Sequence, residues 1–373
     1  MAAALLAACG RDTRPATRPH GFTHYQAVQR AASPDSAEFT QILSMDLDSR
    51  RNIYVADAYD VAVLSPDARP LRRVGRQGKG PGEFDGVTDV RLLPGDSLFV
   101  FDAGSARVTV FDPGSDHPAH TVSLSTAGLF FPYQVAPLPD GGLLGVFRAA
   151  FGVGPDGGER GQRLETIRAF NPDASLRRDS VLTFPEYHAL DVTQGPMSGS
   201  LFSPFIRRTL VAVDGDRIYT AWSDDWRVAV HSATGKNLGT IQPSDAPRPR
   251  PITDAEMDSV VSKMKADLPF SRETIQRAME AAGTRTWPLL QALLVDDAGT
   301  VWLAVAGQRG EPTHWVGVDA QGKRVGAFDL SERVTLHLIR DGAAYGVLLD
   351  DDDVPHVVIY DLKPVHDQPR VRS

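Results

Sequence analysis

The chain has 373 residues, a formal net charge of −8 and 42% hydrophobic residues. This composition is typical of a folded globular protein, and the acidic balance excludes the basic surface that nucleic-acid binding requires. The single cysteine, Cys9, excludes a disulfide framework and thiolate metal sites in the remainder of the chain.

Residues 1–20 are predicted to be an export signal followed by a tether. Leu6-Ala7-Ala8-Cys9 resembles a bacterial lipobox, and residues 11–20 are rich in Thr, Arg and Pro, which is typical of an extended linker. We therefore expect a lipid on Cys9 that anchors the protein to the bacterial envelope, on its periplasmic or extracellular side. Gly10 after the cysteine favours the outer membrane. The alternative is a chance Ala- and Leu-rich start on a cytosolic protein, because no Lys or Arg precedes Cys9.

From residue 21 to residue 373 the sequence repeats a unit with a period of about 43 residues, lengthened where material is inserted. In each unit a polar turn, often with Asp or Gly, precedes an apolar strand. These strands are centred on Tyr54, Phe99, Leu144, Tyr219, Trp302 and Tyr345. Each unit therefore shows three strands in order: one before the turn, the apolar strand after it, and a third strand that follows. Short strands with turns at this period predict an all-β fold, a six-bladed β-propeller of four-stranded blades.

The last unit, Val334 to Leu362, has room for only three strands. A propeller can close its ring when one terminus completes the final blade, which removes an exposed strand edge. Phe22 to Gln29 is the unassigned strand near the other terminus, and we expect it to supply the fourth strand.

A glycine-rich segment, Gly75-Arg-Gln-Gly78-Lys-Gly80-Pro-Gly82-Glu83-Phe84, precedes the second unit. With the two strand cores that follow, Phe99 to Asp102 and Arg107 to Asp112, it resembles an NHL-type repeat. Nearly the whole mature chain is thus similar to six-bladed NHL-like propellers, which are common among bacterial lipoproteins. This resemblance implies the fold strongly and the function hardly at all.

The long connections between strands are all predicted to lie on one face of the propeller. Connections after the first and third strands of each unit are short turns, whereas those after the second and fourth are long: 148–162, 186–204 and 243–286. Long loops on a rigid scaffold usually carry function. We therefore place the binding surface on this long-loop face, around the mouth of the central channel.

Residues 252–283 are predicted to form a helical hairpin inserted between blades four and five. Thr253-Asp-Ala-Glu256 is a capping box, and Met257, Val260, Val261, Met264 and Leu268 make one apolar stripe at helical spacing. The hairpin is either a lid over the channel mouth or a passive cover packed on the blades.

Five side chains on the long-loop face are predicted to bind the ligand. Trp222 and Trp226 flank a polar turn and could stack on a sugar or an apolar side chain, with core packing as the alternative. Tyr133, Arg207 and Trp287 enter their first strands from the same face and are expected to line the channel mouth.

Other polar residues have a structural explanation. We expect Asp57 and Asp102 to cap backbone turns rather than hold a metal. Arg107 and Arg227 occupy the same blade position and are expected to make blade-to-blade hydrogen bonds. The acidic run 350–353 lacks the glycine and spacing of a calcium loop and is expected to be a solvated turn. No catalytic residue, metal site or cofactor is predicted.

Together these patterns predict a monomeric binding or scaffold propeller with a peptide, protein or glycan ligand at the cell envelope. The alternative is a metal-dependent hydrolase or lyase of the lactonase-like propeller type. The sequence shows no matching set of Glu, Asn and Asp at the strand starts, which weighs against that alternative.

Overall fold

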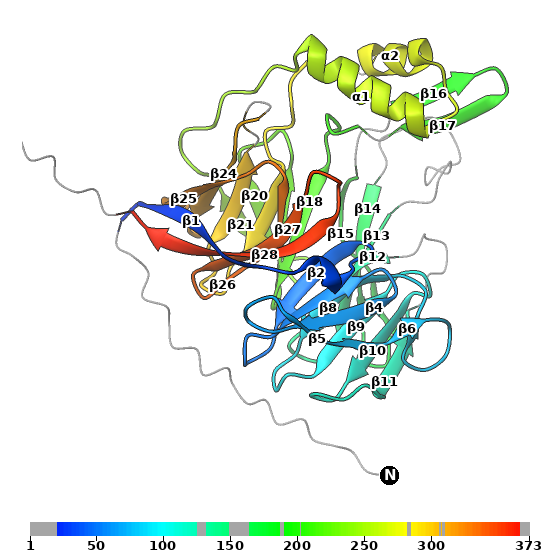
Figure 1. The fold of residues 1–373 in the computed structure, drawn as a ribbon, viewed down its shortest axis with the longest axis vertical. Helices are drawn as coiled ribbons and strands as arrows, with labels where there is room; N and C mark the ends of the chain where they lie inside the picture. Colours follow the sequence, from blue (N-terminus) through cyan, green and yellow to red (C-terminus); the bar gives the residue numbers. More distant parts are fainter. Residues whose placement is uncertain are drawn as a thin grey trace, which may run out of the picture.

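The computed structural model describes residues 21–124, 132–148, 164–186, 190–201, 203–281, 285–305, 307 and 310–365. The predicted signal, the tether and Cys9 lie outside these residues, as do parts of the long connections. The described chain has an all-β, propeller-like fold, with a pair of helices at one end of the molecule (Figure 1). No helix in the described ranges is long and apolar enough to cross a membrane.

Four sheets contain four antiparallel strands each, and each sheet is made of strands that are consecutive in sequence. Their bounds are β2 Ile42–Leu47, β3 Ile53–Asp57, β4 Asp60–Leu64 and β5 Pro70–Val74; β8 Val87–Leu92, β9 Leu98–Asp102, β10 Arg107–Phe111 and β11 Pro118–Ser123; β12 Pro132–Pro137, β13 Leu143–Phe147, β14 Leu164–Phe170 and β15 Leu176–Pro185; β18 Thr209–Asp214, β19 Arg217–Trp222, β20 Val228–Ser232 and β21 Asn237–Ile241.

The remaining long strands form one eight-stranded sheet of order β22-β23-β24-β25-β1-β28-β27-β26. Its members are β1 Thr23–Ala32, β22 Ala292–Val295, β23 Val301–Val305, β24 Thr313–Val318, β25 Arg324–Leu330, β26 Val334–Arg340, β27 Ala343–Leu349 and β28 Pro355–Pro364. The N-terminal strand β1 pairs antiparallel with β28, as expected for Phe22 to Gln29. It meets β25 in parallel over only two residue pairs, Thr23 with Gly326 and His24 with Ala327.

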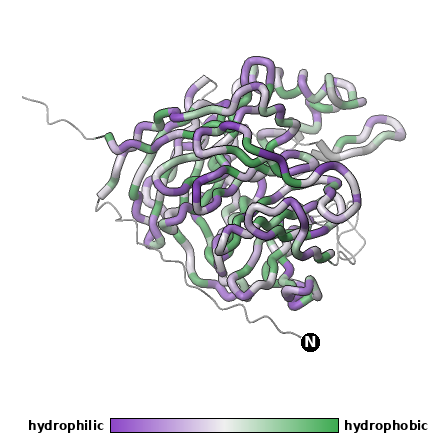
Figure 2. Tube along the Cα trace, turned by 60° about the horizontal axis from the view of Figure 1, so that its bottom comes forward, coloured by the Kyte–Doolittle hydropathy of each residue, from purple (hydrophilic) through white to green (hydrophobic). Residues whose placement is uncertain are grey.

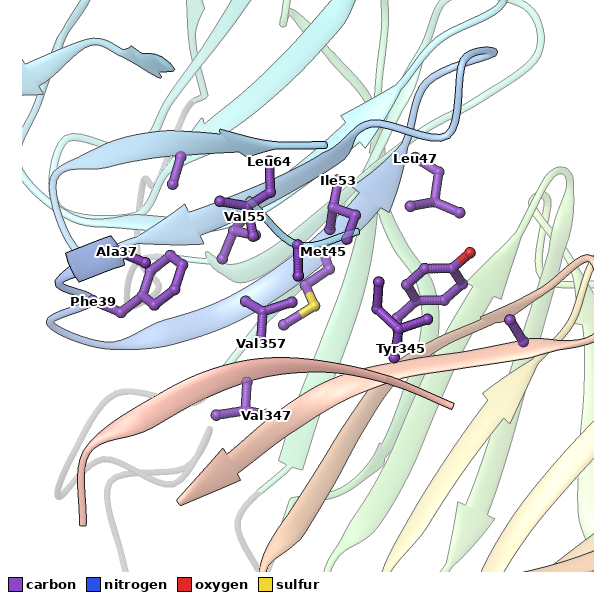
Figure 3. Packing of buried hydrophobic residues seen from close by; sticks show 14 residues of the cluster. Ala37, Phe39, Met45, Leu47, Ile53, Val55, Leu64, Tyr345, Val347 and Val357 are labelled. Atoms are coloured by element: carbon purple, nitrogen blue, oxygen red, sulfur yellow. The ribbon is translucent and has the colours of Figure 1, made fainter. Parts of the chain in front are cut away.

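The first strands of successive repeat units contact one another in most cases. β26 contacts β2, β2 contacts β8, β8 contacts β12, β18 contacts β22 and β22 contacts β26. The sheet of β2 to β5 also packs face to face on the part of the eight-stranded sheet formed by β27 and β28. Figure 3 shows Met45, Ile53 and Val55 of the former against Tyr345, Val347 and Val357 of the latter. Residues from the two ends of the chain thus share one hydrophobic core.

The second strand of each repeat unit is buried on both sides. All five residues of β3, β9 and β13 are buried, which explains why these strands are nearly continuous apolar runs. Outer strands such as β5 and β11 are mostly exposed or half-buried. Figure 2 shows the resulting alternation of hydrophobic and hydrophilic stretches along the chain.

A recurring aspartate explains the short turns between strands. Asp48, Asp296, Asp319 and Asp350 each accept hydrogen bonds through Oδ1 from the backbone N–H groups two and four residues later. This local geometry is a side-chain mimic of a backbone turn. It accounts for the acidic run 350–353, whose first carboxylate closes the turn between β27 and β28.

Smaller elements connect the sheets. A 3-10 helix, η1 Asp35–Ala37, follows β1, and two short strands, β6 Arg76–Gln77 and β7 Glu83–Phe84, pair in parallel within the glycine-rich segment. Gly75 there has a φ of +82° and lies against the Phe84 ring, where a Cβ atom would clash. The motif therefore needs glycine for both conformation and space.

Two helices and a hairpin form a separate layer, with β21 before the helices and β22 after them. α1 Asp254–Asp267 begins with the expected capping box between Thr253 and Glu256 and is followed by α2 Arg272–Ala281. They pack near a hairpin of β16 Leu190–Gln194 and β17 Met197–Leu201 (Figure 1). Their shared core includes Val261, Met264, Ile275 and Met279. We name this layer the cap.

Candidate functional site

Five polar side chains gather where the third four-stranded sheet meets the fourth, at the strand ends from which the long connections leave. We name this group the mouth site. Tyr133 is on β12, Arg148 follows β13, Glu165 is on β14, Glu186 follows β15 and Arg208 precedes β18. The antiparallel order of the sheet places the start of β12, the end of β13, the start of β14 and the end of β15 at one edge.

Both glutamates of the mouth site are buried, with exposed fractions of 4% for Glu165 and 3% for Glu186. The Tyr133 hydroxyl donates a 2.6 Å hydrogen bond to Glu165 Oε2. Arg148 lies over the Tyr133 ring, 4.5 Å from its centroid. The Arg148 Nε atom is 3.9 Å from Glu165 Oε1 and 3.6 Å from Glu186 Oε1, which is longer than a strong charge-assisted hydrogen bond.

Burial raises the pKa of Glu165 to about 7, and the nearby Glu186 carboxylate adds to this effect. The Tyr133 hydroxyl, Arg148 and Arg208 oppose it by stabilising the ionised form. Burial also raises the pKa of Tyr133 well above its usual value, with Glu165 contributing, so its hydroxyl stays protonated and donates. Glu165 therefore exchanges a proton near neutral pH, as groups at functional sites often do.

Arg208 is accessible to solvent and nevertheless desolvated by its surroundings. Burial lowers the pKa of its guanidinium, and repulsion from Arg148 lowers it further. One of its donors, Nη2, is 3.2 Å from the carbonyl oxygen of Gln291. The Arg208 side chain is thus exposed enough for a ligand to reach it.

Sequence reasoning found one of these five residues, Tyr133. Glu165 could have been noticed as a lone acid within the apolar strand Leu164 to Phe170, and Glu186 follows the apolar end of β15. Arg148 and Arg208 carry no local signal, because only the packing of two sheets brings them together.

Arg207 and Trp287 anchor the cap rather than join the mouth site. Arg207 donates to the Phe205 carbonyl at 2.9 Å, to the Thr286 carbonyl and hydroxyl at 2.8 Å, and to Asp224 at 2.7 Å. Trp287 packs edge-on against Phe205, with 4.8 Å between ring centroids. These contacts join the segments that flank the cap to the fourth four-stranded sheet.

The two remaining tryptophans differ in environment. Trp226 is only 5% exposed, packs in the core between the fourth sheet and β22 and β23, and donates its indole N–H to the Ser244 carbonyl at 3.2 Å. The expectation of an exposed Trp226 is therefore corrected, and its core-packing alternative holds. Trp222 ends β19 opposite Thr209 and is half-buried.

The residues given a structural explanation mostly behave as expected. Asp57 accepts backbone N–H bonds from Thr40 and Gln41, and Asp102 accepts one from Asp85. Arg107 donates to the carbonyls of Lys79 and Glu83, in the connection from the neighbouring sheet. Arg227 instead bonds Asp225 in its own sheet, so the blade-to-blade expectation is wrong for this residue.

A second polar group lies on the first strands of the sheets, which we name the channel cluster: Ser44, Asp46, Asp89, Arg91, His337 and Arg340. Asp46 is 2.6 Å from Arg340 and accepts the backbone N–H groups of Leu47 and Leu92 at 2.8 Å. Burial lowers the pKa of His337 to about 4. Within the described ranges no three His, Cys, Asp or Glu side chains are grouped to hold a metal ion.

Comparison with known proteins shows similarity of fold. No family model and no curated protein matches the sequence. A Bacteroides fragilis protein described as a candidate exported protein superposes with a TM-score of 0.55 at 10% identity, covering 93% of this chain and 97% of its own. A member of the DUF4221 family from Bacteroides vulgatus gives 0.56 at 10% identity, covering 92% and 99%. A gluconolactonase from Xanthomonas campestris gives 0.44 at 12% identity, covering 92% and 87%.

Proposed function

We propose that this protein is a lipid-anchored six-bladed β-propeller of the bacterial envelope that binds a peptide, protein or glycan ligand at the mouth site. The observation that carries the proposal is the mouth site itself: two buried glutamates, one with a pKa near 7, lie beneath two arginines at the end of the sheets where the long connections leave. Buried ionisable groups are costly to the fold, and groups with a shifted pKa concentrate at functional sites.

Six blades follow if the eight-stranded sheet is two blades that share an edge. β22 to β25 are consecutive antiparallel strands, and β26, β27, β28 and β1 form a second antiparallel set. The two sets are joined in the sheet by two parallel pairs between β1 and β25. Strand β1 would then close the ring by completing the sixth blade, with the cap between blades four and five.

Placement at the envelope rests on the lipobox-like Leu6-Ala7-Ala8-Cys9 and on the fold shared with a candidate exported protein. The net charge of −8 supports a partner other than nucleic acid, and we propose that the protein acts as a monomer. Metabolic labelling with a palmitate analogue tests the anchor. Label on the wild type and its absence from Cys9→Ser supports it, and an unlabelled wild type overturns it.

Binding is tested by screening the full chain against glycan and peptide arrays, with Arg208→Gln as the site variant. Arg227→Gln is the matched control, because Arg227 is on the same face but is paired with Asp225. Ligands retained by the wild type and the control but lost by Arg208→Gln support the proposal. Ligands bound equally by all three proteins would move the site elsewhere. No observation on the described residues favours the metal-dependent hydrolase or lyase.

A further inference from the structure

We propose that the mouth site binds the carboxylate group of a small acidic ligand, held between Arg148 and Arg208. This inference rests on the proposed function and names the chemistry of the ligand.

Arg148 is positioned to offer donors to a ligand. Its guanidinium is supported from below by the Tyr133 ring, and it faces the two glutamates through Nε alone at 3.6 and 3.9 Å. The side chain is 51% exposed. Engagement through Nε leaves the two Nη groups as the donors that a ligand can reach, and their planar fork matches the geometry of a carboxylate.

Arg208 supplies the second positive charge. It lies close enough to Arg148 for the two guanidiniums to repel each other, and its surroundings desolvate it while leaving it accessible. Arginine remains protonated at neutral pH even with a lowered pKa. An anion placed between the two arginines would relieve this repulsion and replace the water that Arg208 has lost.

The charge of the mouth site depends on one proton. Among the described residues, the groups that face Glu165 are Tyr133 from β12, Arg148 after β13, Glu186 after β15 and Arg208 before β18. When Glu165 is protonated, the site loses one negative charge while both arginines stay charged. The protonated form should therefore bind a carboxylate more tightly, because the repulsion from an ionised Glu165 is absent.

Binding of a carboxylate should consequently take up a proton. The fraction of Glu165 that is protonated falls from about nine tenths at pH 6 to about one tenth at pH 8 for a pKa near 7. If the anion binds the protonated form, its affinity should fall about tenfold between these two pH values.

The test is isothermal titration calorimetry of the full chain with D-glucuronate and with N-acetylglycine, at pH 6 and pH 8, in two buffers of different ionisation enthalpy. Glucose and N-acetylglycinamide are the uncharged controls. We expect both carboxylates to bind, with about tenfold higher affinity at pH 6 and with proton uptake. A preference for glucuronate indicates an acidic sugar as the natural source, and a preference for N-acetylglycine indicates a peptide-like acid.

Variants separate the roles of the residues. Arg208→Gln and Arg148→Gln should each weaken carboxylate binding at least tenfold, and Arg227→Gln should leave it unchanged. Glu165→Gln should keep the pH 6 affinity at pH 8 and abolish proton uptake, a result that a purely structural role for Glu165 would not produce. Melting temperatures of all variants verify that each is folded.

Three outcomes would overturn the inference: no binding of either carboxylate, affinity that rises from pH 6 to pH 8, or unchanged affinity in Arg208→Gln. A neutral or cationic ligand that depends on Arg208 would refute the carboxylate and leave the proposed function standing. If the arrays also yield no ligand that depends on the mouth site, both proposals fail.

Discussion

The mouth site and the channel cluster contain similar residues, carboxylates beside arginines, but they hold their charges differently. In the channel cluster Asp46 is 2.6 Å from Arg340 and accepts two backbone N–H groups at 2.8 Å, and Ser44 donates to Asp89 at 2.7 Å. In the mouth site the Arg148 Nε atom is 3.6 Å from Glu186 and 3.9 Å from Glu165. Asp46 and Asp89 of the channel cluster are engaged in bonds that join neighbouring sheets, whereas Arg148 of the mouth site keeps donors available for a ligand.

This difference predicts opposite effects on stability and binding. Removal of a tightly paired buried charge leaves its partner uncompensated and destabilises the fold. Removal of a loosely held charge from a functional site costs little stability and can even increase it.

Asp46→Ala should lower the free energy of unfolding by about 3–5 kcal/mol, because Arg340 and two backbone N–H groups lose their acceptor. Urea denaturation followed by fluorescence measures this. Arg148→Ala in the mouth site is the control. A loss below about 1 kcal/mol for Asp46→Ala would show that the channel cluster is not the better satisfied of the two.

Glu165→Gln should raise the free energy of unfolding at pH 8 by about 1–3 kcal/mol. The pKa of Glu165 is raised to about 7 in the folded state, so the folded protein binds more protons than the unfolded chain between about pH 4.5 and pH 7. The contribution of Glu165 therefore makes the free energy of unfolding fall as pH rises through this window. The increase in the free energy of unfolding is reduced because the glutamine of the variant would accept a weaker hydrogen bond from the Tyr133 hydroxyl than a carboxylate does. Stability measured from pH 5 to pH 8 should fall less steeply in the variant, and equal slopes would contradict the assignment.

His337→Gln tests the channel cluster through a pH dependence of stability opposite to that of Glu165. Burial lowers the pKa of His337 to about 4, so the unfolded chain binds a proton first as pH falls below about 6.5. The wild type should lose about 1–2 kcal/mol from this residue between pH 7 and pH 5, and the variant should not. Denaturation at the two pH values gives the difference. An equal loss in both proteins would exclude His337 as its source.

Arg148→Gln should have the smallest effect on stability, within about 0.5 kcal/mol, because its side chain is half exposed and its contacts with the carboxylates are long. Its melting temperature should match the wild type while carboxylate binding is weakened. A large destabilisation would mean that Arg148 holds the third sheet together and that the mouth site resembles the channel cluster after all.

The local features of the fold were predictable because they depend on residues close in sequence. The apolar strands around Tyr54 and Phe99, the capping box from Thr253 to Glu256 and the aspartate turns all follow from periodicity or from hydrogen bonds over a few residues. Pairing of Phe22 to Gln29 with β28 was inferred from a missing strand, which is an argument about edges rather than local propensity.

The candidate site was predicted less well. Tyr133 was found, but Arg207 and Trp287 lie at the base of the cap, and Trp226 lies in the core. Their position on the long-loop face could be derived from strand order, whereas the depth and partners of each side chain could not. An aromatic residue near a strand end has the same sequence signature whether it faces a ligand or a neighbouring sheet.

By itself the sequence determined the repeat unit, its turns and the helical character of residues 254–281, since these depend on side-chain alternation and on hydrogen bonds within a few residues. Only the tertiary structure decided that Tyr133, Arg148, Glu165, Glu186 and Arg208 meet, and that Glu165 titrates near neutral pH. These groups come from two sheets and from positions up to 75 residues apart, 133 to 208. Their charges are set by burial, which no local pattern encodes.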